Sequence, residues 1–200
     1  RVQKMKANLI ELKTIPSSTP LGLKGIHQYE NASAAYTAAK IIIPNISKSN
    51  LIRGLQRTEW HGRIEHIQRG QITKLRKNIT ILDGSHNEDG AIVLKNYLNN
   101  NSINNCNLII GMLNNRNPSK FVSTFKEHIN RVYVISIPGI ESSYSSEELT
   151  QELKNIGLSI LGCKNLENAL ERVDKNLPLL ITGSLYLTGH ALKYNETVIN

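Results

Sequence analysis

The strongest constraint on the fold is a regular alternation of short apolar runs and helical patterns that begins at residue 79. The apolar runs, rich in Ile, Leu and Val, lie at 79–83, 107–113, 131–138, 158–163 and 177–183. Their length and branched side chains predict buried strands. Helical spacing follows at 88–99, 119–129, 145–156, 165–176 and 184–193, with capping residues such as Ser119, Ser145 and Asn165. This order predicts an α/β, Rossmann-like domain with a mostly parallel, doubly wound sheet.

The first fifty residues have a different character. They contain a Pro- and Ser-rich loop and an Ala-rich helical pattern from about Asn31 to Ile43. One helix cannot bury a core of its own. We therefore expect residues 1–52 to be the end of another domain that is truncated here, and residues 53–200 to form the α/β domain. The segment 53–70 is expected to be the connector and the first strand of that domain.

The net charge of +8 indicates an anionic partner, because much of the basic excess is concentrated between Arg53 and Lys77. Single-stranded nucleic acid is disfavoured, because Trp60 is the only aromatic residue in that window and such binders stack bases on aromatic rings. A small anion such as a nucleotide fits at least as well, and a solvated basic face without a partner stays open. Neither a membrane-length apolar run nor a signal-peptide pattern is present, so we expect no membrane partner and a cytoplasmic location.

A polar cluster, Asp83-Gly84-Ser85-His86-Asn87, ends the first of the apolar runs. Its simplest interpretation is a tight turn in which Asn87 or Asp89 caps the next helix. The same geometry can hold an anion on backbone N–H groups, while Asp83 accepts from a ribose hydroxyl. A second junction of this kind lies at 182–189, with Ser184 as the expected cap or as a phosphate or carboxylate contact. The carboxyl ends of parallel strands share an edge, which places these two turns and 111–117 together.

Several motifs are missing from the 200 residues. There is no Gly-x4-Gly-Lys-Ser/Thr loop for phosphates and no Gly-x-Gly-x-x-Gly after a strand. Gly-x-Ser-x-Gly is also missing, which disfavours hydrolase chemistry at Ser85 and His86. His61 and His66 have no third residue at metal spacing, so we expect no metal site in the chain.

Four stretches, in order, resemble the folylpolyglutamate synthase and dihydrofolate synthase family, relatives of the Mur peptide ligases. "GIHQYENASAA" (25–35) is similar to the family's G-x-HQ-x-x-NA-x-xA, and "WHGRIEHI" (60–67) to its W-P-GR-x-E. "ILDGSHNEDGA" (81–91) resembles DGAHNP-x-GA, and "ITGSLYLTG" (181–189) resembles TGSLYLVG. The resemblance implies that residues 53–200 are a glutamate-ligase C-terminal domain and that 1–52 end the ATPase domain.

The resemblance also implies the chemistry. The family adds L-glutamate to a folate or pteroate, using ATP to form an acyl phosphate that the glutamate amine attacks. Matched motifs carry over Asn31, Arg63 and Asp83 as ATP contacts. His86, as a catalytic residue, and Ser184, as a substrate contact, match positions near the reacting centre.

The chain departs from the family in two ways. The P-loop and the Mg²⁺ ligands belong to an N-terminal ATPase domain that these residues do not include, so we expect inactivity without a separate polypeptide that carries it. Asn115, Arg116 and Asn117 replace an Asp-Lys-Asp motif of the family. A non-catalytic remnant that binds a nucleotide or another anion is the alternative, and a nucleic-acid binder ranks last.

Overall fold

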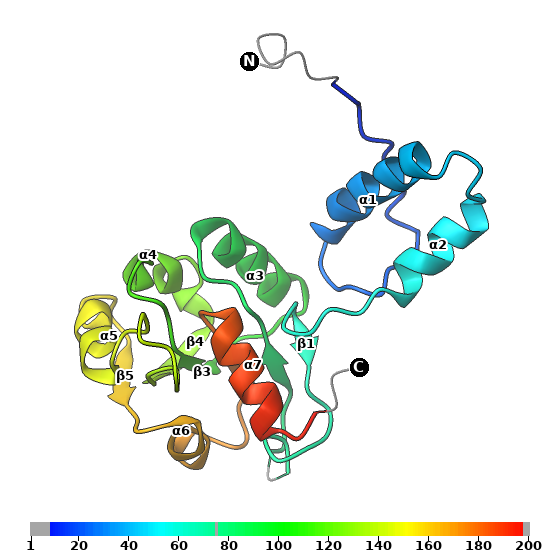
Figure 1. Ribbon diagram of the computed structural model, residues 1–200. Helices are drawn as coiled ribbons and strands as arrows, with labels where there is room; N and C mark the ends of the chain where they lie inside the picture. Colours follow the sequence, from blue (N-terminus) through cyan, green and yellow to red (C-terminus); the bar gives the residue numbers. More distant parts are fainter. Residues whose placement is uncertain (1–8, 75, 198–200) are drawn as a thin grey trace. The chain divides into compact units, whose positions relative to one another are not determined.

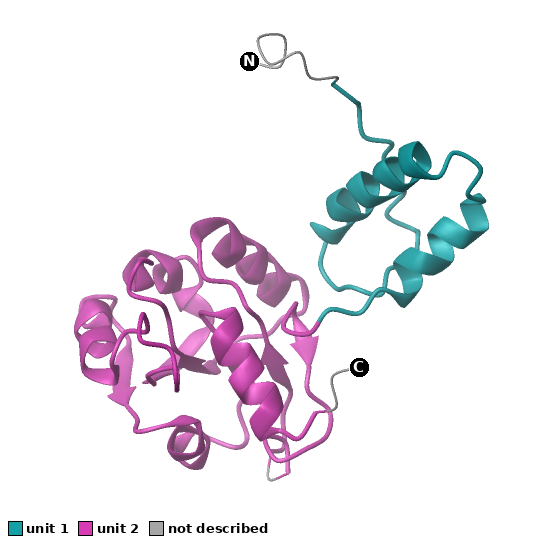
Figure 2. Cartoon of the chain, in the orientation of Figure 1, with its two compact units in different colours: residues 1–60 teal, residues 61–200 magenta. Residues whose placement is uncertain are grey.

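The structure, a computed structural model, describes residues 9–74 and 76–197 and divides into two compact units, residues 1–60 and 61–200 (Figure 2). The division follows helix α2 (Lys48–Arg57). The boundary expected from the sequence, between residues 52 and 53, falls inside that helix. Because α2 packs against α1 (Gln28–Ile42), both helices belong to the first unit.

The first unit has a small core of its own. Tyr36 of α1 and Leu51 of α2 are buried in the same apolar cluster. Leu55, one turn after Leu51 in α2, packs against that cluster. The Ala-rich helix expected near Asn31 is confirmed as α1, although α1 begins earlier, at Gln28. Helix α2 was not anticipated in the basic segment. Two features of the sequence favour this helix. Ser47 is its N-cap, because its side chain accepts a hydrogen bond from the Asn50 N–H at 3.2 Å, and Leu51 and Leu55 have the spacing of one helical turn.

The second unit contains the sheet. Its described strands are β1 (Glu65–His66), β2 (Thr80–Leu82), β3 (Cys106–Ile110), β4 (Ile129–Val134), β5 (Ser159–Gly162) and β6 (Leu179–Thr182). They follow the order β1-β2-β6-β3-β4-β5. All neighbouring strands are parallel except β1 and β2, which are antiparallel. The five strands predicted from residue 79 onward are confirmed.

Helices cover both faces of this sheet (Figure 1). They are α3 (Glu88–Asn100), α4 (Pro118–Ser123), the 3-10 helix η2 (Lys126–His128), α5 (Ser146–Leu153), α6 (Leu166–Arg172) and α7 (Leu185–Tyr194). Apolar side chains of α3, α4 and α5 share one core with the strands, whereas those of α6 and α7 share the other. The fold is therefore the predicted α/β class, a mostly parallel doubly wound sheet. None of the described helices is long and apolar enough to cross a membrane.

Most of the predicted helix caps are confirmed. Ser145 forms a reciprocal capping box with Glu148 at the start of α5, and the Asn165 side chain caps α6. The prediction for Ser119 was wrong, because the Asn117 side chain accepts from the Lys120 N–H at 2.9 Å and starts α4 two residues earlier. A proline follows Asn117 at the first helical position, where the missing N–H costs nothing.

Candidate functional site

The turns after three adjacent strands, β2, β6 and β3, lie together at one edge of the sheet. The Gly183 N–H after β6 donates to the Ser85 carbonyl after β2 at 3.0 Å. Gly183 has φ 110°, and a Cβ there would lie 2.8 Å from the carbonyl oxygen of Gly111, which follows β3. The meeting of these three segments confirms the edge predicted from the strand order, and only glycine fits at position 183.

Asp83, the first residue after β2, is 3% exposed. One carboxylate oxygen, Oδ2, accepts from the Ile64 N–H at 2.9 Å, and the other, Oδ1, accepts from the Ser85 N–H at 2.9 Å. The side chain therefore joins the segment before β1 to the turn after β2. Each oxygen keeps a second lone pair with which it can accept another hydrogen bond.

Arg63 lies on the segment that Asp83 holds. On one side, the Gly62 carbonyl accepts from the Gly84 N–H at 2.8 Å. On the other side, the Ile64 N–H donates to Asp83. The Arg63 side chain is exposed, and within the described ranges its guanidinium has no hydrogen bond or ion pair. A guanidinium with five free donors at the carboxyl edge of a parallel sheet is suited to an anion.

His86 lies in the turn, partly buried, and its Nδ1 is 3.0 Å from the Gly84 carbonyl oxygen. Because a carbonyl only accepts, Nδ1 carries the hydrogen and the neutral ring has its lone pair on Nε2. The next residue, Asn87, accepts from the Gly90 N–H at 3.0 Å and caps α3, as predicted. The predicted catalytic role of His86 stays a prediction.

Ser184 is buried at the start of α7. Its Oγ accepts from the Tyr186 N–H at 3.1 Å, which confirms the predicted cap. The hydroxyl hydrogen remains available as a donor. Contact with a substrate stays a prediction for this residue.

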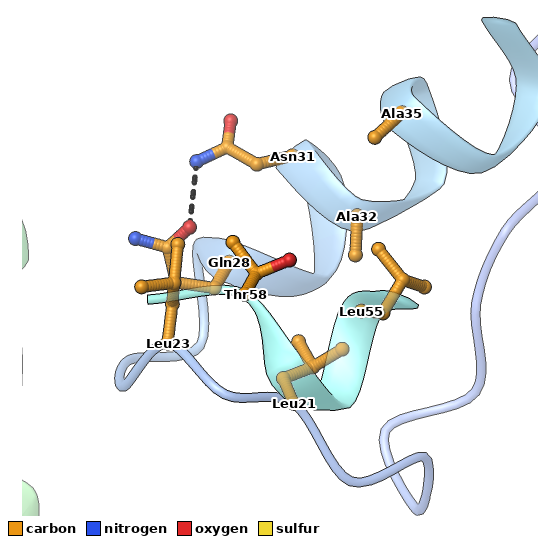
Figure 3. Close-up of a pocket in the computed structure, with 8 residues that line it drawn as sticks. All are labelled: Leu21, Leu23, Gln28, Asn31, Ala32, Ala35, Leu55 and Thr58. Carbon is orange, nitrogen blue, oxygen red and sulfur yellow. Dashed lines mark hydrogen bonds between the residues drawn. The ribbon is translucent and has the colours of Figure 1, made fainter. Parts of the chain in front are cut away.

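Asn31 belongs to the first unit, whereas Arg63 and Asp83 belong to the second. It lines a pocket of about 140 Å³ whose other walls are mostly apolar (Figure 3). The walls comprise Leu21, Leu23, Gln28, Ala32, Ala35, Leu55 and Thr58. The Asn31 Nδ2 donates to Gln28 Oε1 at 3.1 Å. An amide beside an apolar pocket is an arrangement that suits a flat heterocycle with polar edges.

Sequence reasoning missed the role of Glu65, the last residue of the W-x-GR-x-E stretch. Its Oε2 accepts from the Gly62 N–H at 2.9 Å. Its Oε1 accepts from His61 Nδ1, also at 2.9 Å. The signal was present, because the motif itself contains the glutamate two residues after Arg63.

Two groups with shifted pKa values lie at the opposite end of the strands. Burial raises the pKa of the Cys106 thiol, at the start of β3, to about 12. Burial also lowers the pKa of Arg76, which precedes β2, and nearby Asp174 opposes that shift. Cys106 and Cys163 are free and buried. Among the described residues there is no group of His, Cys, Asp or Glu side chains placed to hold a metal ion.

Comparison with solved structures shows the same fold. The folylpolyglutamate synthase of Mycobacterium tuberculosis complexed with ADP and AMPPCP matches with a TM-score of 0.78 at 19% identity, over 92% of this chain and 43% of that one. That of Thermotoga maritima matches with a TM-score of 0.71 at 22% identity, over 100% of this chain and 51% of that one. The bifunctional folylpolyglutamate synthase/dihydrofolate synthase of Yersinia pestis, complexed with AMPPNP and Mn ion, matches with a TM-score of 0.69 at 19% identity, over 89% of this chain and 41% of that one.

Sequence comparison identifies the family. A curated relative from Haloferax volcanii, named "Probable bifunctional folylpolyglutamate synthase/dihydropteroate synthase", is 24% identical over 178 residues. The match covers 84% of this chain and 20% of that relative, so the chain spans about a fifth of its length. Residues 65–194 match the model of the family described as dihydrofolate synthetase, C-terminal domain. Because that match covers more than half of the residues, the chain belongs to the dihydrofolate synthetase C-terminal domain family.

Proposed function

We propose that this chain is the C-terminal part of an ATP-dependent ligase that adds L-glutamate to a folate or pteroate through an acyl phosphate. The observation that carries the proposal is the exposed guanidinium of Arg63, a residue whose neighbouring backbone groups are held at the carboxyl edge of the sheet. It matches the arginine of the family motif in position and in chemistry. The basic excess between Arg53 and Lys77 supports an anionic ligand at this end of the chain.

Each proposed ATP contact has its own chemical role. Arg63 binds phosphate oxygens with its planar fork of donors. Asp83, whose oxygens each keep a lone pair, accepts from a ribose hydroxyl. Asn31 is proposed to contact the base: its Oδ1 can accept, and Nδ2 keeps a second hydrogen to donate besides the one given to Gln28. The apolar pocket beside Asn31 offers a surface for a ring.

His86 and Ser184 are proposed to serve the reacting groups. The lone pair on His86 Nε2 can take a proton from the attacking glutamate amine, since Nδ1 is held by the Gly84 carbonyl. The free hydroxyl hydrogen of Ser184 can donate to a substrate carboxylate at the same edge. Both assignments place proton transfer and substrate binding where the turns after β2 and β6 meet.

The phosphate cradle and Mg²⁺ are proposed to come from an ATPase domain outside these 200 residues, because they contain no Gly-x4-Gly-Lys-Ser/Thr loop. Phosphoryl transfer depends on that loop and on the metal ion for positioning, so these residues alone are proposed to be inactive. Three consecutive isoleucines at the C-terminal end of α1, Ile41, Ile42 and Ile43, are 52%, 77% and 52% exposed. An apolar run of this kind on a small unit is suited to burial against the rest of an ATPase domain.

The test is a reconstitution. The chain is mixed with a polypeptide from the same genome that carries a Walker A loop but has no glutamate-ligase C-terminal domain, and ATP-dependent addition of glutamate is assayed. We expect product only from the mixture. We also expect Arg63→Ala to lower the rate at least tenfold, because one charge-assisted contact to phosphate is worth about 1.5–3 kcal/mol.

Arg69→Ala is the matched control for this assay. Arg69 lies in the same basic segment and is exposed, but its neighbourhood is the far end of α7, where its carbonyl accepts from Asn195 Nδ2. The control is expected to keep the rate. ATP binding without ligation in any mixture would favour the alternative, a non-catalytic nucleotide-binding remnant. Equal losses of rate in Arg63→Ala and Arg69→Ala would show that Arg63 has no specific contact with the phosphate.

A further inference from the structure

The segment that carries Arg63 has an unusual backbone. Gly62, on one side of Arg63, has φ 73°, and Ile64, on the other, has φ 49°. A branched residue such as Ile rarely adopts a positive φ. Ile64 is also only 2% exposed, so its side chain is packed in the core while its backbone is held in this conformation. Such a conformation persists only where surrounding contacts over-determine it.

Four hydrogen bonds supply those contacts. Two come from partners that the proposed site already includes: Asp83 accepts from the Ile64 N–H, and Gly84 donates to the Gly62 carbonyl. The other two come from Glu65, which accepts from the Gly62 N–H and from His61 Nδ1, both at 2.9 Å. The Glu65 carboxylate therefore closes the segment 61–65 on itself.

The hydrogen bonds of the Glu65 carboxylate bear on the availability of Arg63. Glu65 is two residues away and its side chain is 22% exposed, yet within the described ranges it forms no ion pair with Arg63. Its two oxygens instead accept one hydrogen bond each, from His61 Nδ1 and from the Gly62 N–H. Because the Arg63 guanidinium is not paired with this carboxylate, it is available for an external anion, although an opposite charge lies close along the chain.

We infer that Glu65 is a positioning residue for Arg63: it holds the Gly62 amide so that the arginine is presented to the nucleotide phosphate in one fixed orientation. The inference rests on the proposed function, in which Arg63 binds that phosphate. Pre-organising a contact lowers the ordering cost of binding, so releasing the segment weakens binding without removing any group that touches the ligand.

The experiment titrates MgATP into the isotopically labelled full chain and follows the amide signals of residues 61–65 by NMR, a method suited to weak binding. We expect Glu65→Ala to raise the dissociation constant about three- to tenfold, less than or equal to the effect of Arg63→Ala. We also expect the double variant to bind no more weakly than Arg63→Ala alone, because a positioning effect vanishes when the positioned group is gone.

Glu65→Gln is the conservative rescue. Its amide oxygen can accept from the Gly62 N–H while its amide nitrogen donates to His61 Nδ1, so binding is expected to stay within about twofold of the original. Hydrogen exchange at the Gly62 amide should be fast in Glu65→Ala and slow in Glu65→Gln. If Glu65→Ala does not fold, Glu65→Asp, whose side chain is one methylene too short for Gly62, replaces it with the same expected loss.

Three results would overturn the inference. If Glu65→Ala binds MgATP as tightly as the original chain while Arg63→Ala binds weakly, Glu65 has no positioning role. The proposed phosphate contact of Arg63 would still stand. Glu65→Gln losing as much affinity as Glu65→Ala, with the Gly62 amide still protected, assigns the effect to charge. Arg63→Ala binding unchanged shows instead that the proposed phosphate contact itself is wrong, and the positioning role fails with it.

Discussion

The Asp83 carboxylate connects two backbone segments that are 19 residues apart in the chain. It is 3% exposed, and each of its oxygens accepts one backbone N–H. A side chain in this position is structural whether or not it also contacts ATP, because removing an acceptor leaves a buried donor without a partner. Stability and binding therefore need to be separated at this residue.

Replacement of Asp83 by Asn is expected to lower the free energy of unfolding by about 1–3 kcal/mol, because the new NH₂ group faces a backbone N–H of Ile64 or Ser85. Urea unfolding followed by circular dichroism measures the change. Asp89→Asn is the control, since Asp89 is exposed in the first turn of α3 and should shift stability by no more than about 0.5 kcal/mol. Equal midpoints for the two variants would contradict the structural role of Asp83.

At the scale of elements, periodicity predicted the strands from residue 79 onward and most of the helices that follow them, because each buried strand is a dense apolar run. The sequence did not predict α2, whose apolar side chains Leu51 and Leu55 are few among basic residues. It did not predict the bounds of β1 either, a strand of two residues whose position depends on pairing with β2. Residues near the site were predicted from motifs, but the bond between Ile64 and Asp83 depends on the tertiary fold.

The start of β3 has a pH dependence that follows from burial. Cys106 is fully buried, and its pKa rises from an ordinary value of 9.0 to about 12. When the pKa of a thiol is higher in the folded state than in the unfolded state, the thiol stabilises the fold fully at pH values below its unfolded-state pKa. That stabilisation is lost as the pH rises towards the folded-state pKa. Stability should therefore fall between about pH 9 and pH 12, by about 1.4 kcal/mol per pH unit from this group.

Urea unfolding at pH 8 and pH 10 tests this expectation. The loss of stability between the two should be smaller in Cys106→Ala, which has no thiol to ionise. Cys163→Ala is the matched comparison, because burial raises the pKa of that thiol as well, while nearby Arg172 opposes the rise. An identical pH dependence for the original chain and Cys106→Ala would contradict the assignment.

At the scale of the whole molecule, the two units differ in the size of their hydrophobic cores. The described residues of the second unit form two cores, one on each face of the sheet, whereas those of the first form a core of four buried apolar residues, Ile15, Ala32, Tyr36 and Leu51. Small units bury too little surface for independent stability. The sequence predicts a boundary between residues 52 and 53 from the change of character near residue 50, whereas the contacts of α2 place the division between the compact units after Trp60.

Residues 61–200 produced alone are therefore expected to unfold cooperatively, with a urea midpoint close to that of the second unit in the full chain. Residues 1–60 alone are expected to show little cooperative unfolding. Circular dichroism and amide hydrogen exchange on the two fragments measure both outcomes. Fragment 61–200 lacking a cooperative transition would mean that its stability depends on the first unit.

The shortness of β1 has a consequence for aggregation. Glu65 and His66 pair with Leu82 and Ile81, so this two-residue strand is what covers the outer edge of β2. An uncovered edge strand of buried, apolar residues is a template on which other chains can add strands. The loop proposed to hold phosphate is thus continuous with the strand that covers β2, so loosening the loop around Arg63 is expected to promote aggregation as well as to weaken binding.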